Sequence, residues 1–222
     1  MKKKQAGWIK WIVAAAALAL IAAFCRVTIV WDAPASGADA DNLTVAQQYC
    51  LDNWDSKMLP TILEKATDTA TILTAAKQDL SAAGQKYGTR ENETSAWNFI
   101  LKGEAVVVNI ENAEKASKIR LAIDLVPADG TADALIQWST VIKTNAIRDS
   151  VGFLKLDDFA NQVEFAELTK AFNARIQQDL ITKTDATALK GKTISFTGCL
   201  ALSKFAEAKD AEIIPVQLSE VG

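Results

Sequence analysis

The sequence predicts an α+β protein in which a membrane helix is followed by a pair of helices and then by a small five-stranded Greek-key barrel. Three observations predict it: an uncharged apolar run near the N-terminus, apolar residues at helical spacing after it, and alternating apolar and polar residues beyond Trp97. These changes of pattern divide the chain into a signal or anchor segment (1–31), a linker (32–41), a helical region (42–90) and a barrel domain with a helical insert (91–222).

The N-terminal segment has the composition of a membrane anchor. Three lysines at positions 2–4 precede an uncharged run from Trp11 to Cys25, which reaches the roughly 20 residues of a membrane span when Trp8 to Trp31 is counted. Because basic residues stay in the cytoplasm, the chain after Arg26 is expected to face the periplasm from a bacterial inner membrane.

Two other fates compete with an uncleaved anchor. Cys25 could carry a lipid, although Phe24 and Ala22 stand where a lipobox has a small residue and usually a leucine. Cleavage could instead occur at the small residues Ala35-Ser36-Gly37, which lie far beyond the apolar core of the segment. The sequence leaves all three fates open.

The helical region is expected to hold two helices. Asn42 or Thr44 can cap the first, and Pro60 is expected to end it and to stand in the first turn of the second. Gly84 and Gly88 are expected to end the second helix. The apolar residues at helical spacing are Leu43, Ala46, Cys50 and Trp54 in the first helix and Ile62, Ala66, Leu73 and Leu80 in the second.

Five strands are expected after these helices. The first runs from Trp97 to Val108, and a bend at Gly103 is expected to let it serve two sides of a small barrel. Alternation of apolar and polar residues predicts a half-buried second strand. This second strand is expected at Ile119–Leu125, and the other three at Leu135–Ile142, Gly191–Leu202 and Ile213–Val221, the last at an edge because it contains Pro215.

A helical insert separates the third expected strand from the fourth. It ends near Ile181, and its apolar stripe consists of Phe165, Leu168, Phe172, Ile176 and Leu180. Three strands, a helix and two strands is the order of the OB-fold, a small Greek-key barrel. The alternative is an open antiparallel sheet packed on helices.

Composition excludes several classes of function. The chain has no histidine, so histidine-based triads, general bases and metal ligands are excluded together. A net charge of -3 argues against a nucleic-acid partner, which would require a basic patch. We expect no metal site and no cofactor, and the partner that the residues themselves indicate is the membrane.

The two cysteines beyond the anchor have two interpretations. In an oxidising compartment Cys50 and Cys199 can form a disulfide. They can equally be two small buried apolar residues. The sequence does not give the separation of their Cα atoms, so both interpretations stay open.

A group of polar residues follows the third expected strand. Asn145, Arg148 and Asp149, with Asp157 and Asp158 after them, offer the donors and acceptors that commonly bind sugars. The same residues can instead pin the insert to the barrel through hydrogen bonds to the backbone, which is the interpretation that we favour.

An enzymatic alternative rests on acidic residues. Asp157, Asp158, Glu164 and Glu167 could supply the two carboxylates of a glycoside hydrolase. Acidic residues at a helix start usually cap the helix and interact with its dipole, so we expect caps and no enzyme.

A resemblance to a known family is carried by the stretch Thr144-Asn145-Ala146-Ile147-Arg148-Asp149-Ser150, by Asp157-Asp158-Phe159 with Phe165 after it, and by Trp54, Leu59-Pro60, Lys86-Tyr87-Gly88 and Lys102-Gly103-Glu104. Over most of its length after the linker the chain resembles an uncharacterised bacterial family of predicted periplasmic lipoproteins. Genes of this family often stand beside sugar ABC-transporter genes. The resemblance therefore implies an accessory role near carbohydrate uptake, with transporter components as partners.

The sequence as a whole leads us to expect a membrane-tethered periplasmic accessory or binding protein associated with a sugar ABC-transport system. The alternative is a structural or assembly factor of the cell envelope that has no small-molecule ligand. The poor lipobox around Cys25 departs from the lipoprotein description of the family.

Overall fold

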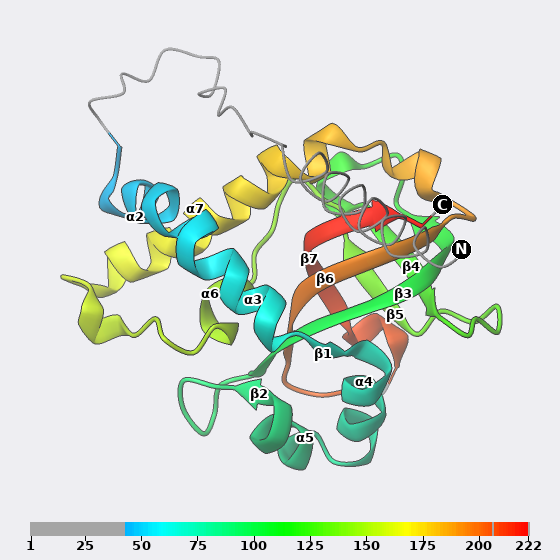
Figure 1. Ribbon diagram of the computed structural model, residues 1–222, viewed down its shortest axis with the longest axis horizontal. Helices are drawn as coiled ribbons and strands as arrows, with labels where there is room; N and C mark the ends of the chain where they lie inside the picture. The colour runs from blue at the N-terminus through cyan, green and yellow to red at the C-terminus, as the bar shows by residue number, and fades with distance from the viewer. Residues whose placement is uncertain (1–42, 206, 222) are drawn as a thin grey trace, which may run out of the picture. The chain divides into compact units, whose positions relative to one another are not determined.

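In the computed structural model, which describes residues 43–205 and 207–221, five strands pair in a closed cycle (Figure 1). From β3 the pairing passes to β4, β5, β7 and β6 and returns from β6 to β3, so the sheet closes on itself. The β5–β7 pair is parallel and the other four are antiparallel. The strands are β3 (Trp97–Glu111), β4 (Arg120–Leu125), β5 (Ala134–Gln137), β6 (Thr193–Leu202) and β7 (Glu212–Glu220).

The long strand β3 joins the two sides of this sheet. Its residues Trp97–Val106 pair with β6, whereas Ala105–Glu111 pair with β4. Gly103 stands just before this exchange of partners, as expected for a strand that serves two sides. Two short strands, β1 (Thr67–Asp68) and β2 (Gly88–Thr89), pair with the first part of β3.

Two expectations about the strands are wrong. The third strand ends at Gln137 and not at Ile142, because the side chains of Gln137 and Ser139 both donate to the carbonyl of Val141 and turn the chain away. Pro215 does not mark an edge, since β7 pairs with β6 on one side and with β5 on the other. Pro215 instead lies opposite Gly198, beside an irregularity in the ladder that tolerates a residue without an N–H.

Pro60 does not end the first helix, which corrects the expected helical pair. Helix α2 (Val45–Asn53) continues through a π-helical turn, η1 (Trp54–Met58), into α3 (Leu59–Lys65). In this turn the Leu59 N–H donates to the carbonyl of Trp54, five residues back. Pro60 has no N–H to donate and fits at the start of α3, so the chain stays helical as far as Lys65.

The second expected helix, which was to begin at Pro60, is divided among α3, α4 (Thr69–Gln78) and α5 (Leu80–Tyr87), with the short strand β1 between α3 and α4. Gly88 ends α5 as expected, whereas Gly84 lies inside it. Asp68 accepts a hydrogen bond from the Thr71 N–H at 2.9 Å, and Asp79 accepts one from the Ala82 N–H at 3.0 Å. Each aspartate therefore caps a new helix start. The helical region holds four α-helices in the described chain.

The insert after β5 contains a short helix, α6 (Ala146–Ser150), and a long one, α7 (Gln162–Asp179). Asn161 caps α7 by accepting hydrogen bonds from the N–H groups of Val163 and Glu164. The expected stripe is confirmed at Phe165, Leu168, Phe172 and Ile176, which are buried. Short 3-10 turns complete the described elements: η2 (Ala116–Lys118), η3 (Leu156–Asp158), η4 (Ile181–Lys183), η5 (Ala186–Leu189) and η6 (Ala208–Asp210).

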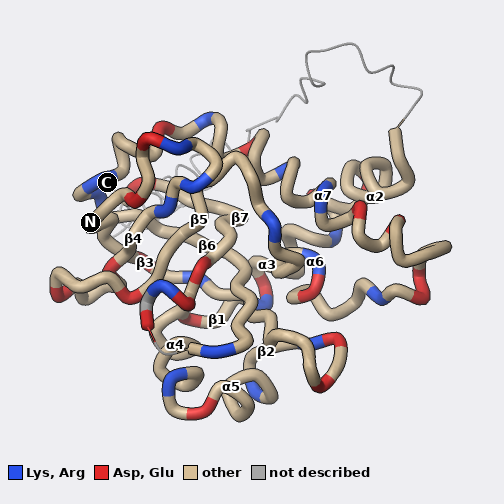
Figure 2. Tube along the Cα trace, turned by 180° about the vertical axis from the view of Figure 1, so that it is seen from behind, with Lys and Arg blue, Asp and Glu red and all other residues tan. Residues whose placement is uncertain are grey.

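One hydrophobic core joins the helices to the sheet. Met58 and Ile62 from the helical region belong to the same buried cluster as Phe99 of β3 and Phe196 of β6. Residues 43–222 accordingly form one compact unit, and the helical region is not a separate body. Along the described chain, basic and acidic residues are interspersed (Figure 2).

No helix in the described part of the chain is both long and apolar enough to cross a membrane. The expected anchor (1–31), with Cys25 inside it, and the linker (32–41) lie outside the described residues.

Gly84 provides the first test of the packing. A Cβ atom on Gly84 would lie 2.0–2.4 Å from three ring atoms of Trp97, whose indole is also held by the Arg90 guanidinium 4.2 Å from the ring centroid. Because the ring has little room to shift, Gly84→Ala should lower the free energy of unfolding by about 1–3 kcal/mol. Urea unfolding of the full chain in detergent measures this loss.

The matched control is Gly103→Ala. The nearest atom to a Cβ there is the Thr69 hydroxyl at 3.4 Å, an ordinary contact. This change should leave the free energy of unfolding unchanged or raise it, because glycine weakens a strand relative to alanine. Equal losses for the two variants would show that the packing around Trp97 is not the cause.

Candidate functional site

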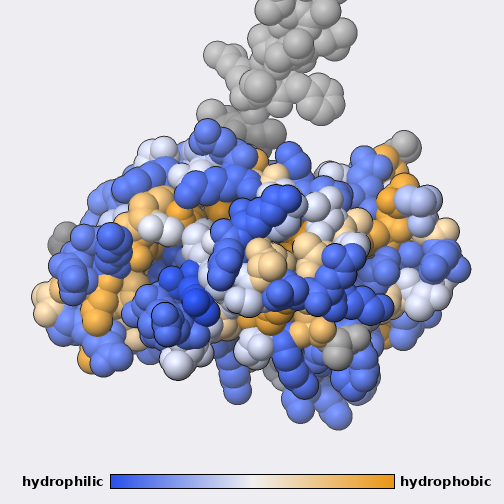
Figure 3. Space-filling view, turned by 90° about the horizontal axis from the view of Figure 1, so that it is seen from below, coloured by the Kyte–Doolittle hydropathy of each residue, from blue (hydrophilic) through white to orange (hydrophobic). Residues whose placement is uncertain are grey.

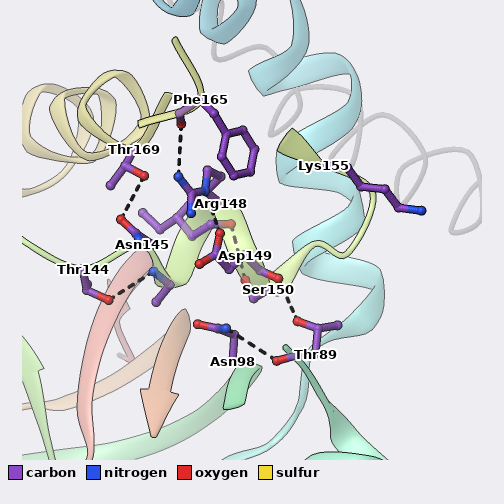
Figure 4. A network of polar contacts seen from close by, with 12 residues as sticks. Thr89, Asn98, Thr144, Asn145, Arg148, Asp149, Ser150, Lys155, Phe165 and Thr169 are labelled. Carbon is purple, nitrogen blue, oxygen red and sulfur yellow. Dashed lines mark hydrogen bonds and ion pairs between the residues drawn. The ribbon is translucent and has the colours of Figure 1, made fainter. Parts of the chain in front are cut away.

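Arg148 is the centre of a buried polar cluster on α6 (Figure 4). Its side chain is buried, with only 6% exposed, and its Nε donates to Asp149 Oδ1 at 2.6 Å. Its Nη1 donates to the carbonyl of Phe165 at 3.1 Å, and the guanidinium carbon lies 3.9 Å from the Phe165 ring centroid. The guanidinium is thus paired with a carboxylate, hydrogen-bonded to the backbone and stacked on a ring.

The cluster ties α6 to three other elements. Asn145 Oδ1 accepts a hydrogen bond from the Thr169 hydroxyl of α7 at 3.1 Å. The Asp149 carbonyl accepts one from the Thr89 hydroxyl of β2 at 2.8 Å, and the Val151 carbonyl accepts one from Lys65 Nζ of α3 at 2.9 Å. The block therefore connects the insert to the helical region and to the strands beside β3.

The structure brings together Asn145, Arg148 and Asp149, and their geometry favours the structural interpretation. A sugar-binding guanidinium would have to reach solvent, whereas this one is enclosed and directed at protein groups. Asp157 and Asp158 are different. They lie exposed on η3 and take no part in the hydrogen bonds of the cluster, as far as the described residues show.

Two of the four carboxylates proposed for a hydrolase, those of Asp158 and Glu164, accept hydrogen bonds from backbone N–H groups near helix starts. Asp158 and Glu164 line one hollow of about 470 Å³, together with aromatic side chains. Asp158 accepts a hydrogen bond from the Lys155 N–H and Glu164 accepts one from the Ala160 N–H, both at 3.2 Å. Glu167 is used in an ion pair with Lys170 at 2.5 Å. The arrangement is the one expected of residues that begin helices.

Tyr49 is the titratable neighbour of these carboxylates in the same hollow. Partial burial raises the pKa of its phenol, and the negative charge of Asp158 raises it further. The phenol therefore stays protonated at neutral pH and can act there as a hydrogen-bond donor.

Cys50 and Cys199, for which a disulfide was one of two interpretations, are not bonded to each other in the structure. Cys50 and Cys199 are both free and both buried, on α2 and β6 respectively. Cys199 Sγ accepts a hydrogen bond from the Ser150 hydroxyl at 3.2 Å. Each thiol fills its own part of the core, so the alternative interpretation, two small buried apolar residues, is the correct one.

A second hollow lies at one end of the sheet, with a volume of about 480 Å³. Three segments form it: helix α4, the β4–β5 connection and the β6–β7 connection. Leu73, Val126 and Phe205 supply apolar surface, while Lys77 and Glu207 supply opposite charges. This mixture of apolar and polar groups from separate elements is typical of small-ligand sites.

Carboxylates hold the β4–β5 connection of this hollow in shape. Asp124 accepts a hydrogen bond from the Gly130 N–H at 2.6 Å, and Asp133 accepts one from the Leu125 N–H at 2.9 Å. Gly130 has a φ of +92°, a conformation that other residues rarely adopt. The loop is therefore pre-formed rather than shaped by a ligand.

Asp124 was missed in the sequence because it occupies a polar position of an alternating strand. The expected half-buried strand would expose it, yet it is buried along with the apolar positions of β4. Asp124 accepts a hydrogen bond from the Gly130 N–H, so the β4–β5 connection folds over this second face, beside α4. Asp124 and Asp133 at the two ends of a loop that contains Gly130 are the local signal that could have indicated a carboxylate-braced loop.

Two comparisons with known proteins bear on this geometry. The family described as "Predicted periplasmic lipoprotein (DUF2291)" matches residues 14–219. This chain belongs to that family. The resemblance stated from the sequence is thereby confirmed.

The DUF2291 chain has an OB-fold. It is similar to the crystal structure of an OB-fold protein from Thermotoga maritima, with a TM-score of 0.66 and 18% identity. The similarity covers 81% of this chain and 100% of the other. At this identity the likeness shows the fold alone. Among curated proteins no match is found.

Arg148 provides a test of the cluster. Arg148→Ala would leave the Asp149 carboxylate and the Phe165 carbonyl without their donor, so the free energy of unfolding should fall by about 3–5 kcal/mol. Arg120→Ala is the matched control, because the Arg120–Glu212 pair at 2.8 Å is only about two-thirds buried (34% and 35% exposed). That change should cost at most about 1 kcal/mol. A stable Arg148→Ala protein would contradict the structural role.

The thiols provide a test that depends on pH. Burial raises the pKa of Cys50 to about 11 and that of Cys199 to about 12, from an ordinary value of 9.0. Because the folded state favours the protonated thiols, their contribution to stability is complete below pH 9.0 and is lost as the pH rises towards 11 and 12.

Alkylation at pH 8, read by peptide mass spectrometry, should label both cysteines only after unfolding. A disulfide-linked peptide pair would contradict this.

Proposed function

We propose that the DUF2291 chain is a non-catalytic, membrane-tethered protein that faces the periplasm and assists a sugar ABC-transport system as an accessory or binding protein. The observation that carries the proposal is the match of residues 14–219 to a family of predicted periplasmic lipoproteins. The basic N-terminus and the apolar run to Cys25 support a tether in the inner membrane. The link to sugar uptake comes from the gene neighbourhood that the resemblance implies.

The hollow beside α4 is the proposed ligand site. OB-folds commonly bind oligosaccharides or oligonucleotides, and the loop between the last two strands contributes to these sites. Here that loop supplies Phe205 and Glu207. A sugar offers an apolar ring face and hydroxyl groups, which match an aromatic side chain beside carboxylate acceptors and the Lys77 ammonium.

A non-catalytic role agrees with the chemistry of the chain. Without histidine, acid–base catalysis would depend on carboxylates. Four of the carboxylates that line the two hollows, those of Asp124, Asp133, Asp158 and Glu164, accept hydrogen bonds from backbone N–H groups of other residues. They brace loops and helix starts, which supports binding over hydrolysis.

The second candidate is a structural or assembly factor of the envelope without a small ligand. The buried Arg148 cluster favours it, because the most specific block of the family resemblance holds elements together and is enclosed by protein. The two candidates differ in whether a sugar stabilises the folded chain.

A thermal-shift comparison of three proteins separates the candidates. A sugar that fills the hollow should stabilise the wild-type chain by about 2.7 kcal/mol at a hundred times its Kd. Phe205→Ala should abolish this shift, whereas Phe153→Ala, which removes an equally half-buried ring from the other hollow, should retain it. No shift of the wild-type melting temperature across a panel of mono- and oligosaccharides would favour the assembly factor.

A further inference from the structure

One end of the described domain exposes aliphatic side chains that the core does not use. We call Leu43, Val45 and Val163 the apolar corner; they are 45%, 59% and 70% exposed. Leu43 directly precedes the N-cap of α2, Val45 is the first residue of α2, and Val163 lies in the first turn of α7. Figure 1 shows the starts of α2 and α7 at the same end of the domain, with the η3 loop beside them.

A hollow with aromatic walls adjoins the apolar corner. Val45 lines it together with Tyr49, Phe153 and Phe159, and its volume is about 470 Å³. Figure 3, which views the domain from below, shows hydrophobic surface in several places between polar side chains. Aliphatic residues at two helix starts beside an aromatic hollow make a surface suited to an apolar partner.

The number of residues between the expected anchor and Leu43 limits how far this surface can lie from the membrane. Only residues 32–42 separate the expected anchor from the first described residue. Eleven residues span about 40 Å at full stretch and roughly 20 Å as a flexible chain. A tether of this length, as the proposed function requires, would limit the distance between the domain and the bilayer, so that even a weak contact would be populated.

The charges around the corner argue for an apolar contact and not an electrostatic one. Asp157, Asp158 and Glu164 carry negative charge on the loop and at the start of α7, and Lys57 and Lys155 carry positive charge beside them. Lys57 Nζ also lies 4.1 Å from the Phe153 ring centroid. Because both signs are present, attraction to anionic lipid headgroups is weak.

We propose that the apolar corner rests on the lipid surface of the bilayer, with Val45 and Val163 inserted among the headgroups and acyl chains. This inference rests on the tether in the proposed function. It assigns the corner a lipid partner that binds by burial of apolar surface, so the contact should persist at high salt and in vesicles without anionic lipid. The ligand hollow beside α4 is not part of this contact.

The test uses the full chain purified from bacterial membranes and reconstituted into vesicles of zwitterionic lipid. A fluorescent amino acid replaces Val163 in one protein and Val126, 50% exposed on the β4–β5 connection, in the matched control. Vesicles with spin-labelled lipids should quench the probe at 163 at least about twofold more than the probe at 126. Val45→Asp should reduce quenching at 163 without lowering the melting temperature, because Val45 is exposed.

Three outcomes would overturn the inference. Equal weak quenching at both positions, in protein that floats with the vesicles, would reject the lipid contact and leave the tether intact. Protein that does not float with the vesicles would reject the tether and the inference together. A probe at 163 that is shielded only at high protein density, without quenching by lipid, would show that a second copy covers the corner.

Discussion

The arrangement of the helices depends on the ion pair and the hydrogen bond that the buried Arg148 guanidinium makes. An enclosed positive charge is tolerated only when its donors find acceptors, and here the acceptors are the Asp149 carboxylate and the Phe165 carbonyl. Since Phe165 belongs to α7 and Arg148 to α6, satisfying the charge fixes the distance between these helices. The backbone next to Asp149 then receives donors from β2 and α3. The block from Arg148 to Val151 thus joins α6 to three other parts of the chain.

Local patterns in the sequence were enough to predict the order of the strands. The start of β3, the position of β4 and the stripe of α7 are properties of single segments and were predicted, whereas β3 continues to Glu111 and β4 is buried on both faces instead of one. The π turn before Pro60 was not predicted, because a proline looks the same whether it breaks a helix or begins one after a wider turn. The caps at Asp68 and Asp79 were not predicted, because the apolar period continues across them.

The candidate sites were less predictable because they combine distant segments. Asn145, Arg148 and Asp149 are neighbours in the chain, so grouping them needed no fold. Their partners Thr89 and Lys65 lie far away in sequence, and only the fold shows that the group is enclosed. The hollow beside α4 has no local signature at all. Its lining joins Lys77 to Phe205, which no period or spacing connects. Asp157 and Asp158 are also close to Arg148 in sequence, but they lie on η3 and take no part in its hydrogen bonds.

The π turn has a consequence for the rotational phase of the first helix. Its buried residues repeat strictly every four positions: Ala46, Cys50, Trp54, Met58, Ile62 and Ala66. In a regular α-helix each such step overshoots a full turn by about 40°, and five steps would carry the last residue roughly 200° around the axis. The π turn takes in one extra residue and so returns roughly 100° of this rotation. What remains is about the width of one apolar stripe. The widened turn therefore allows a four-residue repeat to stay against a single core along the whole helix.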